Sequence, residues 1–129
     1  MQTHISISES EWAVMKIIWN ESPRTLQDVL SGLKHTDWST TTIQTYLARL
    51  VKKGALTTLR QGKGYLYYPA VSEDDCQLAE SRTFLNRVYN GSLSQMVKGF
   101  VKSGSLSADE LSELKKLIDE QEKSNADHL

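Results

Sequence analysis

The chain has 129 residues, 39% hydrophobic and 24% charged, with a net charge of −1, which suits one globular domain or a compact module with an appendage. No apolar run approaches the roughly 20 residues that span a bilayer, and the first residues lack the basic and apolar regions of a secretory signal. A single cysteine excludes an intramolecular disulfide and a cysteine-rich zinc site, so we expect a cytoplasmic protein.

Two helices are predicted at the start of the chain, each introduced by a capping box. In this motif a Ser or Thr and an acidic residue three positions later satisfy free backbone N–H groups. Ser8 and Glu11 form the first pair, and Thr25 and Asp28 form the second. The first helix should reach about Asn20. Apolar residues at helical spacing predict a core-facing stripe on each helix. The stripes are Trp12, Met15, Ile18 and Trp19, then Leu26, Val29, Leu30 and Leu33.

A third helix is predicted to follow Ser39 as its N-cap and to reach Lys53, with Gly54 ending it in a left-handed conformation. Because successive residues are separated by about 100°, this helix has two distinct faces. The inner face should pack on the first two helices. It holds Ile43, Leu47 and Leu50, with Tyr46 at its edge.

After the third helix the helical spacing of apolar residues ends and a strand-like pattern begins. The runs ALTTLR and YLYYPA are rich in β-prone residues, and the residues Gln61-Gly62-Lys63-Gly64 between them permit the positive φ of a hairpin loop. Pro69 fits only near an end or edge of the second strand. Three helices followed by a hairpin is the order of a winged helix, the helix-turn-helix variant with a β wing. We therefore predict a mainly α fold with a small β hairpin, and a winged-helix domain in residues 1–70.

Residues 71–129 are predicted to be helical. Helices should start after Ser72 and at the capping box of Ser107 and Glu110, with breaks at Asn90-Gly91 and Ser103-Gly104. Three short helices hold too little surface for a core of their own, so a second copy of the chain would bury their apolar faces in a symmetric dimer. We predict a dimerisation region in residues 71–123 and a flexible tail in residues 124–129. The predicted dimerisation residues are Leu85, Val88, Tyr89, Leu93, Met96, Val97, Phe100, Leu111, Leu114, Leu117 and Ile118.

Charge is distributed unevenly along the chain. Residues 1–70 carry eight Lys or Arg against five Asp or Glu, a net +3, whereas residues 71–129 carry seven against eleven, a net −4. The stretch from Trp38 to Val71 contains five basic residues and no acid. The first half of the chain therefore suits a polyanionic partner, since an acid on such a surface would repel it.

The outer face of the third helix is predicted to enter the major groove of DNA. Short threonines permit close approach, Gln44 can pair with adenine, and Ala48 can touch a thymine methyl. Cations would meet phosphates, as would the N–H groups and hydroxyls at the helix start, and the hairpin would reach neighbouring backbone or a minor groove. The predicted DNA-binding residues are Ser39, Thr40, Thr41, Thr42, Gln44, Thr45, Ala48, Arg49, Lys52, Arg60 and Lys63. Threonine-rich faces also occur in proteins that bind nothing, and a winged helix can serve as a protein-interaction module.

Nothing in the sequence indicates an enzyme, a cofactor or a metal site. His4, His35 and His128 lie in different segments without ligand spacing. The acidic pairs at Asp74 and Asp109 fall at helix starts, where negative charge complements the helix dipole. A lone thiol such as Cys76 is more often an inert, partly buried group than a sensor.

Four segments carry a resemblance to a known family: ISESEWAVMKIIW, WSTTTIQTYLARLVKKGAL, GYLYYP and RTFLNRVYNGSLSQMVKGFVKSGSLSADELSELKKLI. Over about residues 5–121 the chain resembles the penicillinase-repressor family, which includes β-lactamase, methicillin-resistance and copper-responsive repressors. The resemblance implies a homodimeric repressor that binds a palindromic operator with TACA/TGTA-like half-sites. It also implies a C-terminal dimerisation region.

The resemblance implies two alternative release mechanisms. In the β-lactam branch, a membrane sensor with a cytoplasmic zinc metalloprotease cuts the dimerisation region, typically at an Asn-Phe bond. The matching bond here is Gly99-Phe100. In the copper branch, paired C-terminal cysteines take up copper, and this chain has only Cys76. A copper-operon repressor without the usual cysteine-rich site is thus the alternative within the family.

Overall fold

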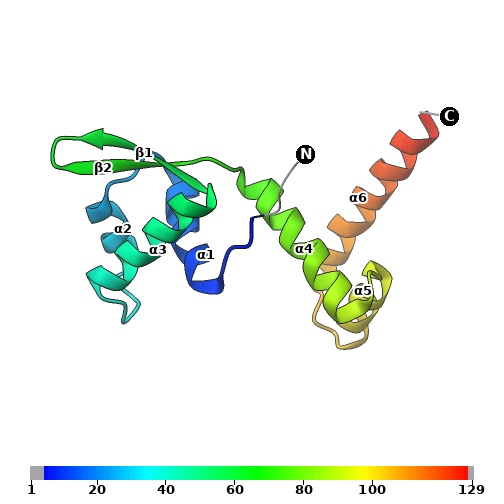
Figure 1. Ribbon diagram of the computed structural model, residues 1–129. Helices are drawn as coiled ribbons and strands as arrows, with labels where there is room; N and C mark the ends of the chain where they lie inside the picture. The colour runs from blue at the N-terminus through cyan, green and yellow to red at the C-terminus, as the bar shows by residue number, and fades with distance from the viewer. Residues whose placement is uncertain (1–4, 128–129) are drawn as a thin grey trace. The chain divides into compact units, whose positions relative to one another are not determined.

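The computed structural model describes residues 5–127, which form six α-helices and a two-stranded antiparallel sheet (Figure 1). The elements in chain order are α1 (Glu9–Asn20), α2 (Leu26–Gly32), α3 (Thr40–Lys53), β1 (Leu56–Gln61), β2 (Gly64–Pro69), α4 (Glu73–Tyr89), α5 (Leu93–Lys102) and α6 (Ala108–Asp127). The chain divides into two compact units, one ending at Ser81 and one beginning at Arg82. The predicted fold class, three helices and a hairpin followed by helices, is confirmed.

Both predicted capping boxes at the start of the chain are present. The Ser8 hydroxyl accepts the Glu11 N–H at 3.2 Å, and the Glu11 carboxylate accepts the Ser8 N–H at 2.9 Å. Thr25 and Asp28 exchange the same two hydrogen bonds at 3.1 and 3.0 Å. The bond from the Thr25 N–H is the main reason that the pKa of Asp28 lies below its ordinary value. These bonds fix where α1 and α2 begin, because each satisfies N–H groups that have no intrahelical acceptor.

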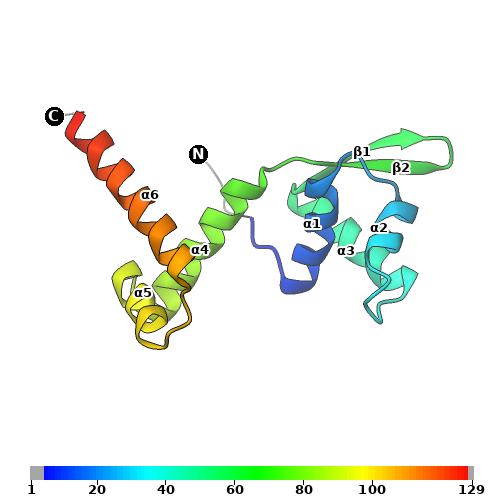
Figure 2. The same cartoon turned by 180° about the vertical axis from the view of Figure 1, so that it is seen from behind.

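The core of the first unit lies between α1, α2, α3 and the base of the hairpin, and the three helices lie on one side of the hairpin (Figure 2). Eleven hydrophobic residues are at most 7% exposed: Ile7, Val14, Met15, Ile18, Val29, Leu33, Ile43, Leu47, Leu50, Ala55 and Leu56. Trp12 and Trp19 pack against this cluster as a tilted pair with ring centroids 5.5 Å apart. The stripes predicted on all three helices are therefore core residues, as expected.

The hairpin pairs Leu56 with Pro69 and Gln61 with Gly64, which leaves two residues in the loop. Gly62 is the first of them and has φ +60°, as the first central position of a type II′ turn requires. Pro69 is the last residue of β2, so no hydrogen bond of the strand interior is lost. One further β-bridge was not predicted. The backbone of Arg24, before α2, exchanges hydrogen bonds of 2.8 and 3.1 Å with Tyr67 of β2.

The segment that follows β2 makes contacts with the core of the first unit. The Trp19 indole N–H donates to the Val71 carbonyl at 2.9 Å, and Cys76 packs against the first core. The first compact unit extends to Ser81, within α4. The domain boundary after residue 70 stays a prediction.

In the second unit the predicted helix breaks occur where expected. Asn90 and Gly91 have φ of 51° and 85°, and Ser107 and Glu110 form the third capping box. The flexible tail predicted for residues 124–129 needs correction, because α6 continues to Asp127. No Gly or Pro interrupts the helix after Ala108, and the Gln121 amide donates to Asn125 one turn later at 3.2 Å. Residues 128 and 129 lie outside the described part of the chain.

Candidate nucleic-acid interface

The outer face of α3 is open to solvent, whereas its inner face is fixed by the core. Ile43, Leu47 and Leu50 are each at most 2% exposed, so the helix cannot rotate without exposing them. The opposite face carries the exposed residues Thr41, Gln44, Thr45, Ala48, Arg49 and Lys52. The arrangement presents short polar side chains in the first turns and cations in the last turns.

The start of α3 uses part of its polar groups for capping. The Ser39 hydroxyl accepts the Thr42 N–H at 3.1 Å and donates to the Thr42 hydroxyl at 3.0 Å. Thr42 is half-buried, whereas Thr40 and Thr41 are exposed. The first intrahelical donor is the N–H of Ile43, so the N–H groups of Thr40 and Thr41 are those left for an anion. Ser39 therefore shapes the helix start and has its hydroxyl proton engaged, whereas the Thr42 hydroxyl acts as the acceptor of that bond.

The hydroxyl of Thr45 also has a partner within the helix. It donates to the Thr41 carbonyl at 3.0 Å. With its proton engaged, the exposed side chain offers a methyl group and oxygen lone pairs to a ligand. Those groups match a thymine methyl or a base donor such as the adenine amino group.

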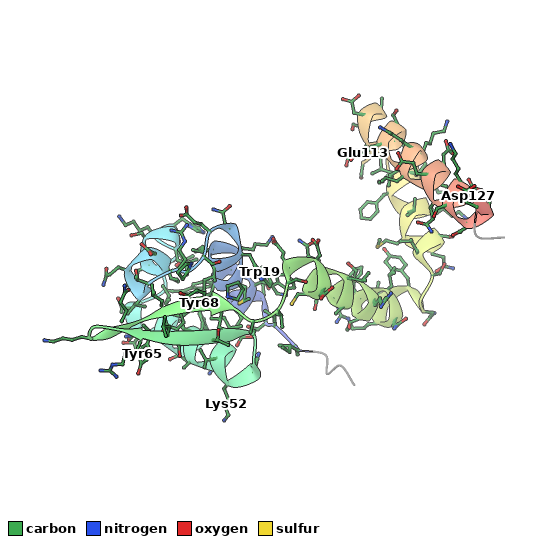
Figure 3. The ribbon with its side chains drawn as sticks, turned by 90° about the horizontal axis from the view of Figure 1, so that it is seen from above. Trp19, Lys52, Tyr65, Tyr68, Glu113 and Asp127 are labelled. Atoms are coloured by element: carbon green, nitrogen blue, oxygen red, sulfur yellow. The ribbon has the colours of Figure 1, made fainter. Side chains whose placement is uncertain are left out.

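The two lysines at the end of α3 have different surroundings. Lys52 extends away from the first unit into solvent (Figure 3). Lys53 instead pairs with the Glu11 carboxylate and donates to the Ser6 carbonyl at 2.8 Å, which ties α3 to the start of α1. Of the adjacent pair, Lys52 is therefore the cation available to a polyanion.

Among residues 5–81 of the first unit, Glu11 is the one charged side chain that is buried, at 2% exposed. Burial alone would raise its pKa. The hydrogen bonds from Lys53 and from the Ser8 N–H outweigh that effect and hold the pKa below its ordinary value. The sequence pattern around Glu11 indicates only a capping residue. The pairing with Lys53 joins residues 42 positions apart, and no local pattern indicates it.

The hairpin contributes two further cations. Lys63 lies in the two-residue loop and Arg60 lies near the end of β1, and both are exposed. The Arg60 guanidinium carbon lies 5.7 Å from the centroid of the Tyr65 ring. Tyr65 is 45% exposed although it is a large aromatic residue, and no sequence pattern indicated it as part of the site.

No group of His, Cys, Asp and Glu residues between residues 5 and 127 could hold a metal ion. His35 is exposed, while His4 and His128 lie outside the described residues. Burial, and then the charge of Asp75, raise the pKa of the Cys76 thiol, so it is protonated and a weak nucleophile at neutral pH. Over the same residues no helix is both long and apolar enough to cross a bilayer.

The first unit thus has the architecture of a winged helix-turn-helix domain, with α3 in the place of the recognition helix and β1–β2 as the wing. The family model named "Penicillinase repressor" matches residues 7–120, and the chain belongs to this family of repressors.

Two relatives show how far the similarity extends. The penicillinase repressor of Bacillus licheniformis is 43% identical over 115 residues, which is 88% of this chain and 90% of that protein. The methicillin resistance regulatory protein MecI of Mammaliicoccus sciuri is 35% identical over 116 residues, 89% of this chain and 94% of MecI. The similarity thus extends through both units.

Two solution structures resemble the first unit. The DNA-binding domain of the repressor BlaI has a TM-score of 0.53 and 42% identity, covering 58% of this chain and 93% of that one. The monomeric form of Bacillus licheniformis BlaI in complex with the blaP half-operator has a TM-score of 0.50, with the same identity and coverage. The winged-helix assignment therefore stands both on the elements and on solved relatives.

Proposed function

We propose that this protein is a dimeric transcriptional repressor that binds a palindromic operator with TACA/TGTA-like half-sites. The observation that carries the proposal is the exposed outer face of α3, which has two cations, Arg49 and Lys52, and no carboxylate. The core positions this face, and a helix of this kind fits the major groove. In the relative from Bacillus licheniformis, a monomer forms a complex with a half-operator, which supports one subunit per half-site here.

Each part of the predicted site has a separate role in this proposal. Gln44, Thr45 and Ala48 lie against base edges, and Thr41 at the helix start approaches the groove. Arg49 and Lys52 meet phosphates, as do the N–H groups of Thr40 and Thr41. Ser39 and Thr42 hold the helix start in place through their mutual hydrogen bonds. Arg60 and Lys63 extend the contact along the backbone or a minor groove.

Dimerisation is the role of the second unit. In α4, α5 and α6 no described residue is buried, and large apolar side chains remain exposed on all three helices. The unburied members of the predicted dimerisation set include Val88, Leu93, Phe100, Leu111, Leu114, Leu117 and Ile118, at 37% to 57% exposed. Leu85, Tyr89, Met96 and Val97 are half-buried. A second copy would cover these faces and hold two α3 helices at half-site spacing, which raises affinity through effective concentration.

Release of the operator would follow from loss of the dimer. A membrane sensor metalloprotease cutting at Gly99-Phe100 would separate α6 from α4 and remove part of the shared apolar surface. Both residues are exposed in α5, and a glycine inside a helix lowers its local stability. Since a helical bond must unwind to enter a protease, this local weakness favours cutting there.

The proposal is tested by titrating a labelled operator duplex and a random duplex with the full chain across salt concentrations. The logarithm of the affinity should fall linearly with the logarithm of salt concentration. Lys52→Ala should weaken binding to both duplexes by the same factor and reduce the salt slope by about one. Gln44→Ala should instead reduce the difference in affinity between the operator and the random duplex. Lys116→Ala on the polar side of α6 removes an equal charge and serves as the control. Binding that ignores salt would refute the proposal.

A further inference from the structure

The wing carries an aromatic residue that the core does not use. Tyr67 of β2 packs against the core and exchanges backbone bonds with Arg24, but Tyr65, two residues nearer the loop, is 45% exposed. Tyr65 and Lys52 extend on the same side of the first unit, away from Trp19 (Figure 3). An exposed aromatic ring on the side of the predicted DNA contacts has no evident role in stability.

Tyr65 lies directly opposite Arg60 in the hairpin register. Their side chains share one face of the two strands, and the guanidinium carbon is 5.7 Å from the ring centroid. This is within the range of an attractive cation–π contact. Among residues 5–127 no carboxylate forms an ion pair with Arg60, so the ring does not compete with a carboxylate for the guanidinium.

A guanidinium in a cation–π contact uses none of its N–H groups in an ion pair, so these donors stay free for another ligand. Two of these donors can bond a phosphate in parallel, which requires the planar group to be correctly oriented. An unrestrained arginine loses rotamer freedom when it binds, and a side chain already held by a ring loses less. The ring would thus improve a phosphate contact without itself carrying charge.

We propose that Tyr65 is a positioning residue that holds Arg60 for contact with a phosphate of the duplex backbone. The inference rests on the proposed function, because it assumes that the side of the unit bearing Lys52 meets DNA. It adds a residue of β2 to the interface and assigns Arg60 to the backbone rather than to bases. Loss of the ring should therefore weaken binding to the operator and to the random duplex by the same factor.

The test uses the full chain and a labelled operator duplex, with Tyr65→Leu, Tyr65→Phe, Arg60→Ala and the double variant Tyr65→Leu with Arg60→Ala. Tyr65→Leu should weaken binding about two- to fivefold, the range expected of an exposed cation–π pair. Tyr65→Phe keeps the ring and should bind like the parent chain. The double variant should bind no more weakly than Arg60→Ala alone, since the ring acts through the arginine.

The salt dependence separates positioning from a structural role. Arg60→Ala should reduce the salt slope by about one, and Tyr65→Leu should also reduce it although tyrosine carries no charge. Leu59→Ala, an exposed change on the other face of β1, is the matched control and should leave both affinity and slope unchanged. Thermal melts of every variant establish that the hairpin is intact.

Three results would overturn the inference. They are an unchanged affinity in Tyr65→Leu, additive losses in the double variant, and a loss in Tyr65→Phe equal to that in Tyr65→Leu, which would assign the effect to the hydroxyl. If Lys52→Ala still weakens binding in the same assay, only the wing inference fails. If the parent chain does not bind the duplex at all, both proposals fail.

Discussion

The two units of this chain differ in how completely they bury their apolar residues. The first has eleven hydrophobic residues at most 7% exposed. Hydrogen bonds also join Arg24, before α2, to Tyr67 of β2 and Trp19 of α1 to Val71, after β2. The second has helices with clear caps and breaks but no buried residue among those described. Both units have well-formed secondary structure, yet only the first has a core.

The difference separates what a local sequence pattern can specify from what burial must add. Caps and periodicity define each helix of the second unit, but isolated helices gain most of their stability from packing an apolar face. A face that stays open in one chain therefore points to a partner surface. The first unit needs no such partner, because its stripes already cover one another.

The largest expected effect comes from truncating matched leucines in the two units. Leu50→Ala removes a fully buried side chain and should lower the free energy of unfolding by about 3 kcal/mol. Because that core lies within one chain, the loss should be the same at all protein concentrations. Leu117→Ala, at a position 54% exposed in one chain, should destabilise by an amount that depends on concentration. Chemical denaturation at several concentrations measures both.

Equal, concentration-independent losses in the two variants would contradict the contrast between the units. A negligible loss in Leu117→Ala at every concentration would remove the second copy from the explanation.

The next largest effect should come from a charge placed in the contact surface of the proposed dimer, which should separate the two copies. Leu114→Glu places a carboxylate on the apolar side of α6, and burying it against a partner is unfavourable. We expect operator affinity to fall about 30-fold, roughly 2 kcal/mol, with a sedimentation coefficient of a monomer. Ser112→Glu adds the same charge on the opposite side of the helix. A dimer that survives Leu114→Glu, or is lost equally in Ser112→Glu, would show that this face is not the contact.

The Glu11–Lys53 pair sharpens the contrast because it belongs to the first unit alone. Glu11→Gln keeps a capping amide but removes the charge, and should lower the free energy of unfolding at pH 7 by about 1 to 2 kcal/mol. Glu9→Gln, a charge change in the same turn, is the control. Denaturation curves of the full chain give both values.

The pH dependence of that difference follows from the lowered pKa of Glu11. The ionised carboxylate stabilises the folded state fully above the unfolded pKa of about 4.3, and this contribution is lost as the pH falls through the lower folded value. The difference in the free energy of unfolding between the parent chain and Glu11→Gln should therefore be largest near neutral pH and should shrink below about pH 4. A gap that stays constant would mean that the charge contributes nothing.

Much of the fold was predictable because its determinants are local. Ser8, Thr25 and Ser107 mark helix starts through bonds to residues three positions away, and Gly54 ends α3 with φ +86°. The buried side of α3 followed from the helical spacing of Ile43, Leu47 and Leu50, and the hairpin followed from the β-prone runs after Gly54. The packing of the segment after β2 on the first core was not predictable, since Trp19 bonding Val71 and Cys76 contacting the core are contacts across the fold.

The candidate site was predictable in composition but not in detail. The absence of acids from Trp38 to Val71 indicated which surface to examine. It could not show that Lys53 is engaged by Glu11 while Lys52 is free, because that depends on a long-range contact. Nor could it show that Arg60 lies over Tyr65, which depends on the register of the hairpin.

The smallest expected effect comes from deleting one cap in each unit. Ser8→Ala and Ser107→Ala each remove a hydroxyl that accepts a backbone N–H at 3.1 to 3.2 Å, and each should cost about 1 kcal/mol. For Ser8→Ala, calorimetry should show the same loss of stability at both of two protein concentrations. If a second copy covers α6, as proposed, the loss of stability in Ser107→Ala should appear as a weaker dimer, because packing of the apolar face supplies most of a helix's stability. If the loss of stability is independent of protein concentration in both variants, α6 is stable within its own chain, and the exposed apolar face needs another explanation.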